Sequence, residues 1–307
     1  MKDEQPNQEF DSSDPLKSDN TESILDSFRF VNGRRYHNLD DVTYLLPNDN
    51  KEAKRLYLQH NLFKFAWQNN YSSPIHEFLK SGKAKVLDIG CGSGHWILDM
   101  AREYPQATFV GIDMSPLFPD AKNTPSNVLF LQHNLNNGIP FPNETFDFVF
   151  QRFLCNNVVL DKWKIYVKEM IRVTKSGGWL EFFEFELNYD RASAFHLQVL
   201  ELVHSAFEAK GIISKPESVI PPFLETCQEL SEVHFKEVSI PIGHWAGQLG
   251  TMMLTYTLMN AETIRLLITS AWGVDDKTFD WIFENSNREF DENKLHTKSF
   301  RWFSKKI

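Results

Sequence analysis

A short strand that runs directly into three closely spaced glycines constrains this chain more than any other stretch of its 307 residues. Val86, Leu87 and Ile89 form an apolar run typical of a parallel strand that is covered on both faces. This run is followed by a glycine at every second position: Gly90, Gly92 and Gly94. Glycines this close together weaken a regular element, so they predict a tight loop whose backbone a ligand can approach.

A helix is expected directly after the glycine loop. The residues from His95 to Ala101 have helical spacing, so the free amides at the start of this helix point back toward the loop. Such a helix start favours an anionic group on the ligand. The strand, loop and helix therefore predict a ligand site at the carboxyl end of a strand, where ligands bind in open α/β sheets.

The spacing of the glycines distinguishes between cofactors. Dinucleotide sites use G-x-G-x-x-G after the first strand, whereas this chain has G-x-G-x-G, with Asp88 two residues before the first glycine. A second strand ends in Asp113, roughly twenty residues after Gly94, as expected for a carboxylate that binds ribose hydroxyls. These features resemble motif I of the class I methyltransferases, which use S-adenosylmethionine (SAM). The alternatives are a nicotinamide cofactor, or glycines that only allow helix and strand to pack.

Strands and helices alternate through the middle of the chain in the order of a parallel doubly wound sheet. Seven strands are expected, the last of them antiparallel beside the fifth, at 85–89, 108–112, 128–131, 146–150, 179–185, 235–242 and 298–303. We therefore expect an α/β fold with a Rossmann-like seven-stranded sheet, as in class I methyltransferases, and extra helices in the C-terminal part.

Composition and pattern divide the chain into four parts. Residues 1–27 are polar and acidic, which predicts a disordered tail. Residues 28–80 are expected to form an N-terminal helical cover segment, and residues 81–188 the SAM-binding core. Residues 189–307 are expected to complete the sheet and to supply a helical lid or substrate wall.

The adenine end of SAM is expected to meet residues that follow the second and third strands. Met114 is placed to flank the adenine ring, although a core methionine fits this position nearly as well. Asn134, with Leu135 beside it, occupies the position where class I methyltransferases often carry an adenine-binding acid. Its side-chain amide can both accept and donate a hydrogen bond, so recognition of adenine is preserved without the charge.

The methionine end of SAM is expected to meet Gln151 and Arg152, which end the fourth strand. Arg152 is a candidate partner for the methionyl carboxylate or for the substrate. A structural ion pair with Asp147 or Glu181 is an equally good interpretation of Arg152.

The catalytic residues remain unknown because the sequence contains no obvious catalytic dyad. Tyr36 and His37 are candidates, since they precede an apolar helix and the first strand, where a segment can fold over the cofactor. The alternative is that Tyr36 packs as an ordinary aromatic residue and His37 lies at the surface. Glu184 is the third candidate, with a solvated strand end as its alternative. A base is required only if the acceptor is a hydroxyl or a protonated amine.

The charge pattern excludes several classes of partner. Residues 1–27 carry eight acidic and two basic side chains, so six of the nine net negative charges belong to this tail. The remaining chain is nearly balanced and has no basic stripe, so direct nucleic-acid binding is not expected. Three scattered cysteines fit neither a disulfide framework nor a zinc site, and no metal is expected.

No targeting or membrane segment is apparent. The N-terminus lacks the charged-then-apolar order of a secretion signal. The most apolar region, 249–272, is interrupted by Asn260, Glu262 and Arg265, which favours a buried helix pair over a membrane span. We therefore expect an intracellular protein, in the cytoplasm or the nucleus, without membrane contact.

A wider resemblance extends from about residue 36 to residue 302. Beyond the SAM motifs it rests on segments at 35–37, 44–49, 94–96, 177–181 and 240–245. This combination resembles the fungal LaeA-like (TAM-domain) methyltransferases, which are linked to secondary metabolism and development. Many relatives carry a histidine after the core of the fourth strand, where this chain has Phe150. Any acid–base role of that histidine therefore cannot be transferred.

The resemblance implies a SAM-dependent methyltransferase that acts on an unidentified small-molecule or protein acceptor. The alternative is a methyltransferase-like regulator that acts through contacts with a protein partner in fungal secondary metabolism or development. Intact Asp88 and Asp113, together with the three glycines, favour the enzyme.

Overall fold

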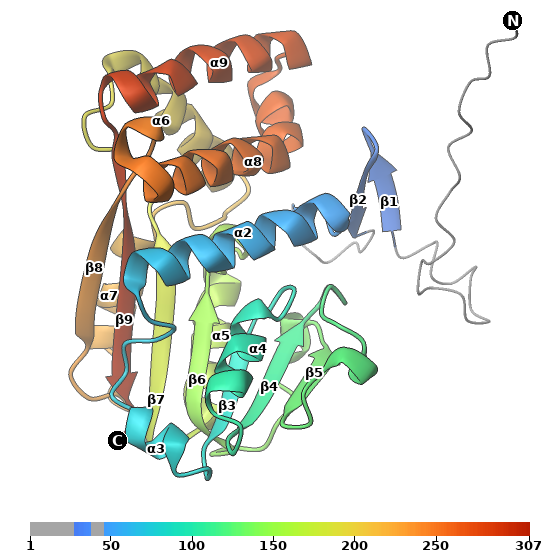
Figure 1. Cartoon of the computed structure of the whole chain (residues 1–307), viewed down its shortest axis with the longest axis vertical. Helices are drawn as coiled ribbons and strands as arrows, with labels where there is room; N and C mark the ends of the chain where they lie inside the picture. Colours follow the sequence, from blue (N-terminus) through green and yellow to red (C-terminus); the bar gives the residue numbers. More distant parts are fainter. Residues whose placement is uncertain (1–27, 38–45) are drawn as a thin grey trace, which may run out of the picture.

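Seven strands form one sheet in the order β5-β4-β3-β6-β7-β9-β8 (Figure 1). The computed structural model describes residues 28–37 and 46–307, so the predicted tail 1–27 lies outside the described residues. The strands of this sheet are β3 Lys85–Ile89, β4 Thr108–Asp113, β5 Val128–Gln132, β6 Phe146–Arg152, β7 Thr174–Phe185, β8 His234–Pro241 and β9 His296–Lys305. Strands β3 to β7 are parallel, and β9 runs antiparallel between β7 and β8. The predicted doubly wound sheet is confirmed.

Helices cover both faces of the sheet. They are α2 Asn50–Trp67, α3 His76–Lys80, α4 His95–Glu103, α5 Leu160–Val173, α6 Ala194–Glu208, α7 Pro216–Glu225, α8 Gly247–Trp272 and α9 Asp276–Glu292. Alternation along each strand sends side chains to two separate cores. Val86 joins the core that contains Trp96 of α4, whereas Leu87 joins the core that contains Trp163 of α5.

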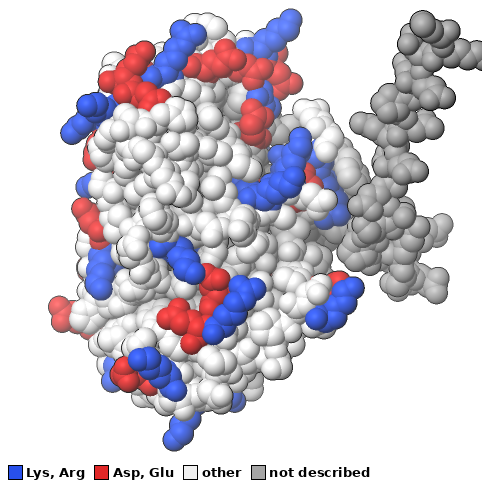
Figure 2. Space-filling view, in the orientation of Figure 1, with Lys and Arg blue, Asp and Glu red and all other residues white. Residues whose placement is uncertain are grey.

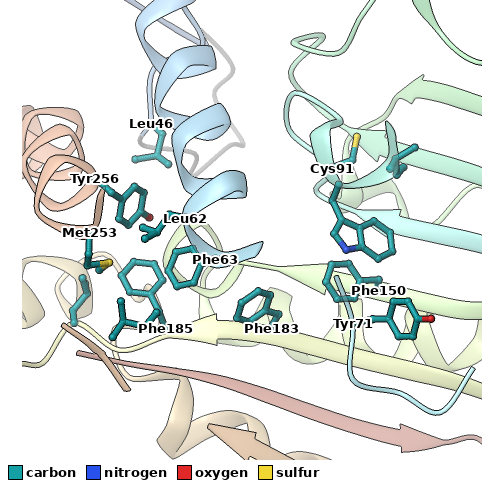
Figure 3. Packing of buried hydrophobic residues seen from close by; sticks show 14 of the residues in the cluster. Leu46, Leu62, Phe63, Tyr71, Cys91, Phe150, Phe183, Phe185, Met253 and Tyr256 are labelled. Carbon is teal, nitrogen blue, oxygen red and sulfur yellow. The ribbon is translucent and has the colours of Figure 1, made fainter. Parts of the chain in front are cut away.

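The long helix α2 crosses above the carboxyl ends of the parallel strands, and α6, α8 and α9 lie beyond it (Figure 1). Aromatic rings join these layers. Phe63 of α2 packs against Phe185 of β7 and Tyr256 of α8, with ring centroids 5.7 and 5.9 Å away, and the three rings are seen together in Figure 3. Gln59 of α2 also donates a 2.7 Å hydrogen bond to the Tyr256 hydroxyl. The carboxyl edge of the sheet is therefore roofed by α2 and then by α8.

Three features differ from the sequence-based expectations. The chain enters the cover segment through a two-stranded hairpin, β1 Phe28–Val31 and β2 Arg34–His37, and not through a helix. The apolar region 249–272 lies in one continuous helix, α8, and not in a helix pair. Strand β7 begins at Thr174, before Gly177 and Gly178, whereas the sequence predicts a strand from residue 179. A Cβ on Gly178 would lie 2.9 Å from the Asp147 carbonyl oxygen, so a glycine lets β7 pass close to β6.

Charges of both signs are interspersed on the face shown in Figure 2, and no basic stripe crosses it. Within residues 28–37 and 46–307, no helix combines the length and hydropathy that a bilayer span requires. Among the same residues, no group of three His, Cys, Asp or Glu side chains is arranged to hold a metal ion.

The segment between α2 and α3 is attached to the sheet by the buried carboxylate of Glu181. This carboxylate accepts hydrogen bonds from the backbone amides of Ser72 and Ser73 at 2.8 Å and from the Ser73 hydroxyl at 2.7 Å. The Arg301 guanidinium lies 3.7 Å away, and both charged side chains are at most 1% exposed. Removal of the carboxylate would leave the two amides without their acceptor and the buried Arg301 cation without its counter-ion.

We therefore expect Glu181→Leu to lower the free energy of unfolding by about 2–4 kcal/mol, because breaking a buried charge pair leaves the remaining charge and the amides buried without a partner. Ser73→Ala removes one hydroxyl donor and keeps the amides paired, so about 0.5–1.5 kcal/mol is expected for this control. Urea unfolding followed by circular dichroism measures both variants. Equal losses in the two would contradict the anchoring role of Glu181.

Candidate functional site

The glycine loop lies at the carboxyl edge of the sheet and is bonded to the neighbouring strand β4. The amides of Gly90 and Cys91 donate to the Ile112 carbonyl at 2.9 and 3.1 Å. The amide of Gly92 donates to the Asp113 carboxylate at 2.8 Å. These bonds bend the chain sharply after β3, which requires the positive φ angles of 68° at Gly90 and 55° at Gly92.

The three glycines have different roles. Gly90 and Gly92 line a cavity at the end of the sheet. Gly94 lines neither cavity, and a Cβ at this position would clash with the Phe130 ring. Gly94 also caps helix α4 without a side-chain hydrogen bond, so amides of the first turn of α4 face the loop, as the sequence predicts.

Two cavities meet at this edge. The first occupies about 880 Å³, including its mouth, and the second about 550 Å³. They share the lining residues Gly90, Asp113, Leu154 and Asn157. Arg152 lines only the first cavity, which extends under α2 and α8. The two cavities thus form one elongated cleft that is centred on Gly90 and Asp113.

The second cavity collects the residues predicted for adenine. Met114, Asn134 and Leu135 all line it, together with Lys162 and Tyr166 of α5. The Asn134 side-chain oxygen accepts a 3.0 Å hydrogen bond from the Asn136 amide and caps the short helix η2 Leu135–Asn137.

Asp113 joins the two cavities and links two loops. Its carboxylate accepts from the Ser115 amide at 2.7 Å, in addition to the amide of Gly92. Burial raises the pKa of Asp113 to about 6, although the backbone amides act in the opposite direction. The group is therefore charged at neutral pH and presents an acceptor to the cleft.

Asp88 is fully buried, and neither of its carboxylate oxygens has a hydrogen-bond partner among the described residues. Burial raises the pKa of Asp88 to about 7, and the positive charge of Arg152 offsets only part of this shift. A buried carboxylate without donors is costly, and Asp88 lies two residues before Gly90 without lining either cavity.

Arg152 points into the first cavity from the end of β6. Its guanidinium donates to Nδ1 of His60 at 3.1 Å, and Nε2 of His60 lies 3.0 Å from the Asp99 carboxylate. Lys64 also donates to Asp99. Burial lowers the pKa of His60 to about 4, so His60 is neutral and accepts from Arg152. Arg152 forms neither of the ion pairs considered from the sequence, because Asp147 is bonded to Lys175 and Glu181 lies beside Arg301.

Gln151 and Glu184 lie behind the cavity wall. Gln151 donates to Glu184 at 2.6 Å, and the same carboxylate accepts from the amides of Leu154 and Cys155 at 2.9 and 3.1 Å. Burial raises the pKa of Glu184 to about 7. Neither residue lines the two cavities. Their contacts hold the turn after β6, where Phe153 has a positive φ of 54°.

The other catalytic candidates lie on the hairpin strand β2. Tyr36 is buried and lines a separate depression beside the start of α2 and the middle of α8. The side chain of His37 lies outside the described residues. Phe150, at the position of the histidine found in relatives, stacks on Trp96 with ring centroids 4.1 Å apart. This position is therefore part of the core.

Several lining residues escaped the sequence analysis. Leu154 follows β6, while Tyr256 and Asn260 belong to α8, more than a hundred residues from the glycine loop. No local pattern marks Tyr256 and Asn260, because these two residues reach the cleft only through the packing of α8 against α2. Arg55 and Gln59, four residues apart on α2, also line the cleft, and their i, i+4 spacing on a helix was the one available signal.

Comparisons with known proteins agree with this geometry. Residues 86–178 match a family model described as a methyltransferase domain. Methyltransferase str2 of Strobilurus tenacellus is 34% identical over 209 residues, which cover 65% of this chain and 71% of that protein. The secondary metabolism regulator laeA of Coprinopsis cinerea is 26% identical over 286 residues, covering 85% and 69%.

The fold has a solved counterpart in phosphoethanolamine N-methyltransferase 2 of Haemonchus contortus in complex with SAM. Its TM-score is 0.51 at 15% identity, over 89% of this chain and 61% of that one. The sheet order and the glycine loop define a class I methyltransferase. The similarity of this chain to str2 and to the laeA protein then identifies the family. The chain belongs to the LaeA-like SAM-dependent methyltransferases.

The raised pKa of Asp88 predicts a pH dependence of stability. A carboxyl group whose pKa is higher in the folded than in the unfolded state stabilises the fold at low pH. This contribution is lost as the pH rises from about 4 to about 7. We expect Asp88→Asn to match the wild type at pH 4.5 and to be more stable by about 1–3 kcal/mol at pH 8, without SAM.

Urea unfolding at pH 4.5, 6 and 8 measures this difference. Asp161→Asn, at an exposed position in the first turn of α5, is the control and should follow the wild type at every pH. A wild-type pH profile in Asp88→Asn would show that Asp88 does not carry the effect.

Proposed function

We propose that the cleft binds SAM with its adenine in the second cavity and its methionine part in the first. The observation that carries this proposal is the buried carboxylate of Asp88, two residues before Gly90. This carboxylate lacks a hydrogen-bond donor among the described residues. Asp88 itself lines neither cavity, so the ammonium group of SAM, bound beside Gly90, would compensate its charge from the cleft. Arg152, which lines the first cavity, would meet the methionyl carboxylate.

The residues of the second cavity suit a nucleoside. Asp113 would accept from the ribose hydroxyls, and Met114 and Leu135 would flank the adenine. Asn134 keeps its amide nitrogen available, since its oxygen already accepts from Asn136. Gly90 and Gly92 would allow close approach of the cofactor, while Gln151 supports the wall from behind. The donor and acceptor set therefore fits SAM from end to end.

The chain would act mainly by orientation and by exclusion of water. SAM, when bound, supplies a methyl group that is already activated by its sulfonium. Helices α2 and α8 roof the cleft, and Arg55 and Gln59 of α2 bond to the Tyr256 hydroxyl there. Holding reactants in line contributes about 7–11 kcal/mol in favourable cases, so catalysis does not require a dyad. For Glu184 we infer a positioning role, since its carboxylate holds the turn after β6. Tyr36 and His37 remain candidates as catalytic residues.

A regulatory role is the second candidate function. It is favoured by the names of relatives such as the laeA protein of Coprinopsis cinerea. In that case the chain would act through a protein partner, in the nucleus or the cytoplasm. An intracellular compartment is supported by free thiols at Cys91, Cys155 and Cys227. Methyl transfer from SAM to a small-molecule or protein acceptor would favour the enzyme. Binding of a protein partner without SAM would favour the regulator.

Isothermal titration with SAM and with NAD tests the cofactor. We expect SAM to bind and NAD not to bind. We expect Gly92→Val to abolish SAM binding, because its side chain would enter the cleft at a backbone φ of 55° that disfavours branched residues. Gly33→Val, at a positive-φ hairpin position with open space around it, is the control for backbone strain. Equal binding of NAD and SAM would overturn the assignment.

Arg152→Met tests the carboxylate contact. Loss of a charge-assisted hydrogen bond costs about 1.5–3 kcal/mol, so we expect SAM affinity to fall roughly 10- to 100-fold. Decarboxylated SAM lacks the carboxylate and should bind wild type and variant equally. If the variant weakens both ligands to the same extent, Arg152 acts on something other than this carboxylate.

A further inference from the structure

A third cavity opens behind the cofactor cleft, among α6, α8, α9 and the end of β7. It occupies about 610 Å³, including its mouth. Its wall is mainly apolar, with Val199 and Val203 from α6, Met253 and Ile264 from α8, and Phe283 and Phe290 from α9. These helices lie together beyond α2 in Figure 1.

The lining of this cavity differs in charge from the lining of the cofactor cleft. The first cavity presents Arg55, Asp113 and Arg152. No Lys, Arg, Asp or Glu is among the described residues that line the third cavity. A charged ligand would lose its hydration there without gaining a counter-ion, at a cost of several kcal/mol. The third cavity therefore selects against phosphates, carboxylates and ammonium groups.

The third cavity adjoins the methionine end of the proposed cofactor cleft and shares part of its wall. Phe185, Leu187, Tyr256, Asn260 and Ile264 line both. The rings of Phe185 and Tyr256, 5.8 Å apart, lie at this junction and are seen beside Met253 in Figure 3. A molecule in the third cavity would thus reach the part of the cleft where the methyl group of SAM is expected.

One buried polar side chain, His196, belongs to this mainly apolar wall. His196 is 3% exposed and lines the cavity, and its Nδ1 has no hydrogen-bond partner among the described residues. The nearest carboxylate oxygen, on Glu289, is 3.6 Å away, beyond hydrogen-bond distance. Glu289 is already bonded to the Ser193 hydroxyl and amide. An unpaired buried nitrogen favours an occupant that brings its own hydrogen-bonding group.

We infer that this third cavity binds the methyl acceptor, and that the acceptor is a small, uncharged, largely apolar molecule with a hydroxyl group that His196 recognises. This inference rests on the proposed SAM site, because the junction at Tyr256 and Asn260 would direct the acceptor toward the methyl group. A lysine, arginine or carboxylate side chain of a protein acceptor does not suit the uncharged wall.

Two probes that differ in charge test this inference. 2-Naphthol is uncharged at neutral pH and carries one hydroxyl, whereas naphthalene-2-sulfonate has the same ring with a negative charge. Both are titrated calorimetrically into the full chain, with and without saturating S-adenosylhomocysteine. We expect 2-naphthol to bind one site at least tenfold more tightly than the sulfonate.

Variants then locate the binding site. Val203→Trp fills the cavity from α6, and Ala261→Phe fills it from α8 at a half-buried position, which serves if the first variant fails to fold. Each should weaken 2-naphthol at least tenfold without changing the affinity for S-adenosylhomocysteine. Leu197→Trp, exposed on the same helix α6, is the matched control and should bind like the wild type. His196→Phe should weaken 2-naphthol about three- to tenfold.

The outcomes separate the acceptor site from the cofactor site. Absence of 2-naphthol binding, equal binding of the sulfonate, or unchanged binding in a folded cavity-filling variant each overturns the inference. Failure of S-adenosylhomocysteine to bind the wild type contradicts the proposed SAM site instead, and the titrations without it still decide the ligand preference of the third cavity.

Discussion

Buried negative charge is the constraint on which the geometry of this site depends. Three carboxylates lie inside the sheet, and two of them, unlike the third, accept hydrogen bonds from backbone amides. Glu181 is met by amides of the segment between α2 and α3, and Glu184 by amides of the turn after β6. These hydrogen bonds attach both segments to the sheet, because a buried carboxylate requires donors. Asp88 has no such donor among the described residues, and in the proposed binding mode the ammonium group of SAM compensates its charge.

The roof of the cleft depends on one residue of α8. The Tyr256 hydroxyl accepts from Gln59 and Arg55 of α2, and its ring packs on Phe63 and Phe185. Burial raises the pKa of Tyr256 to about 12, so the phenol keeps its proton at neutral pH. The same ring borders the cofactor cleft and the cavity behind it. Its position therefore links the packing of α2 on α8 to the shape of both cavities.

Local features of the site could be predicted from the sequence, and tertiary ones could not. The loop after β3 and the acid at the end of β4 are set by residues adjacent in the chain, so their spacing revealed them. The partner of Arg152 is His60, ninety-two residues earlier, and no pattern in either segment indicates that pair. The Phe130 ring also requires a glycine at position 94, through a contact between the start of α4 and β5 that only packing reveals.

The antiparallel strand β9 has a consequence for the order in which the chain can fold. It is the last element, yet it lies between β7 and β8 and bonds to both along most of its length. A ribosome must therefore release the chain through β9 before these two strands gain their shared neighbour. Until then β7 offers an open edge, the kind of surface that pairs with other chains. Loss of β9, by a stop codon before residue 296 or by proteolysis, would leave that edge exposed permanently.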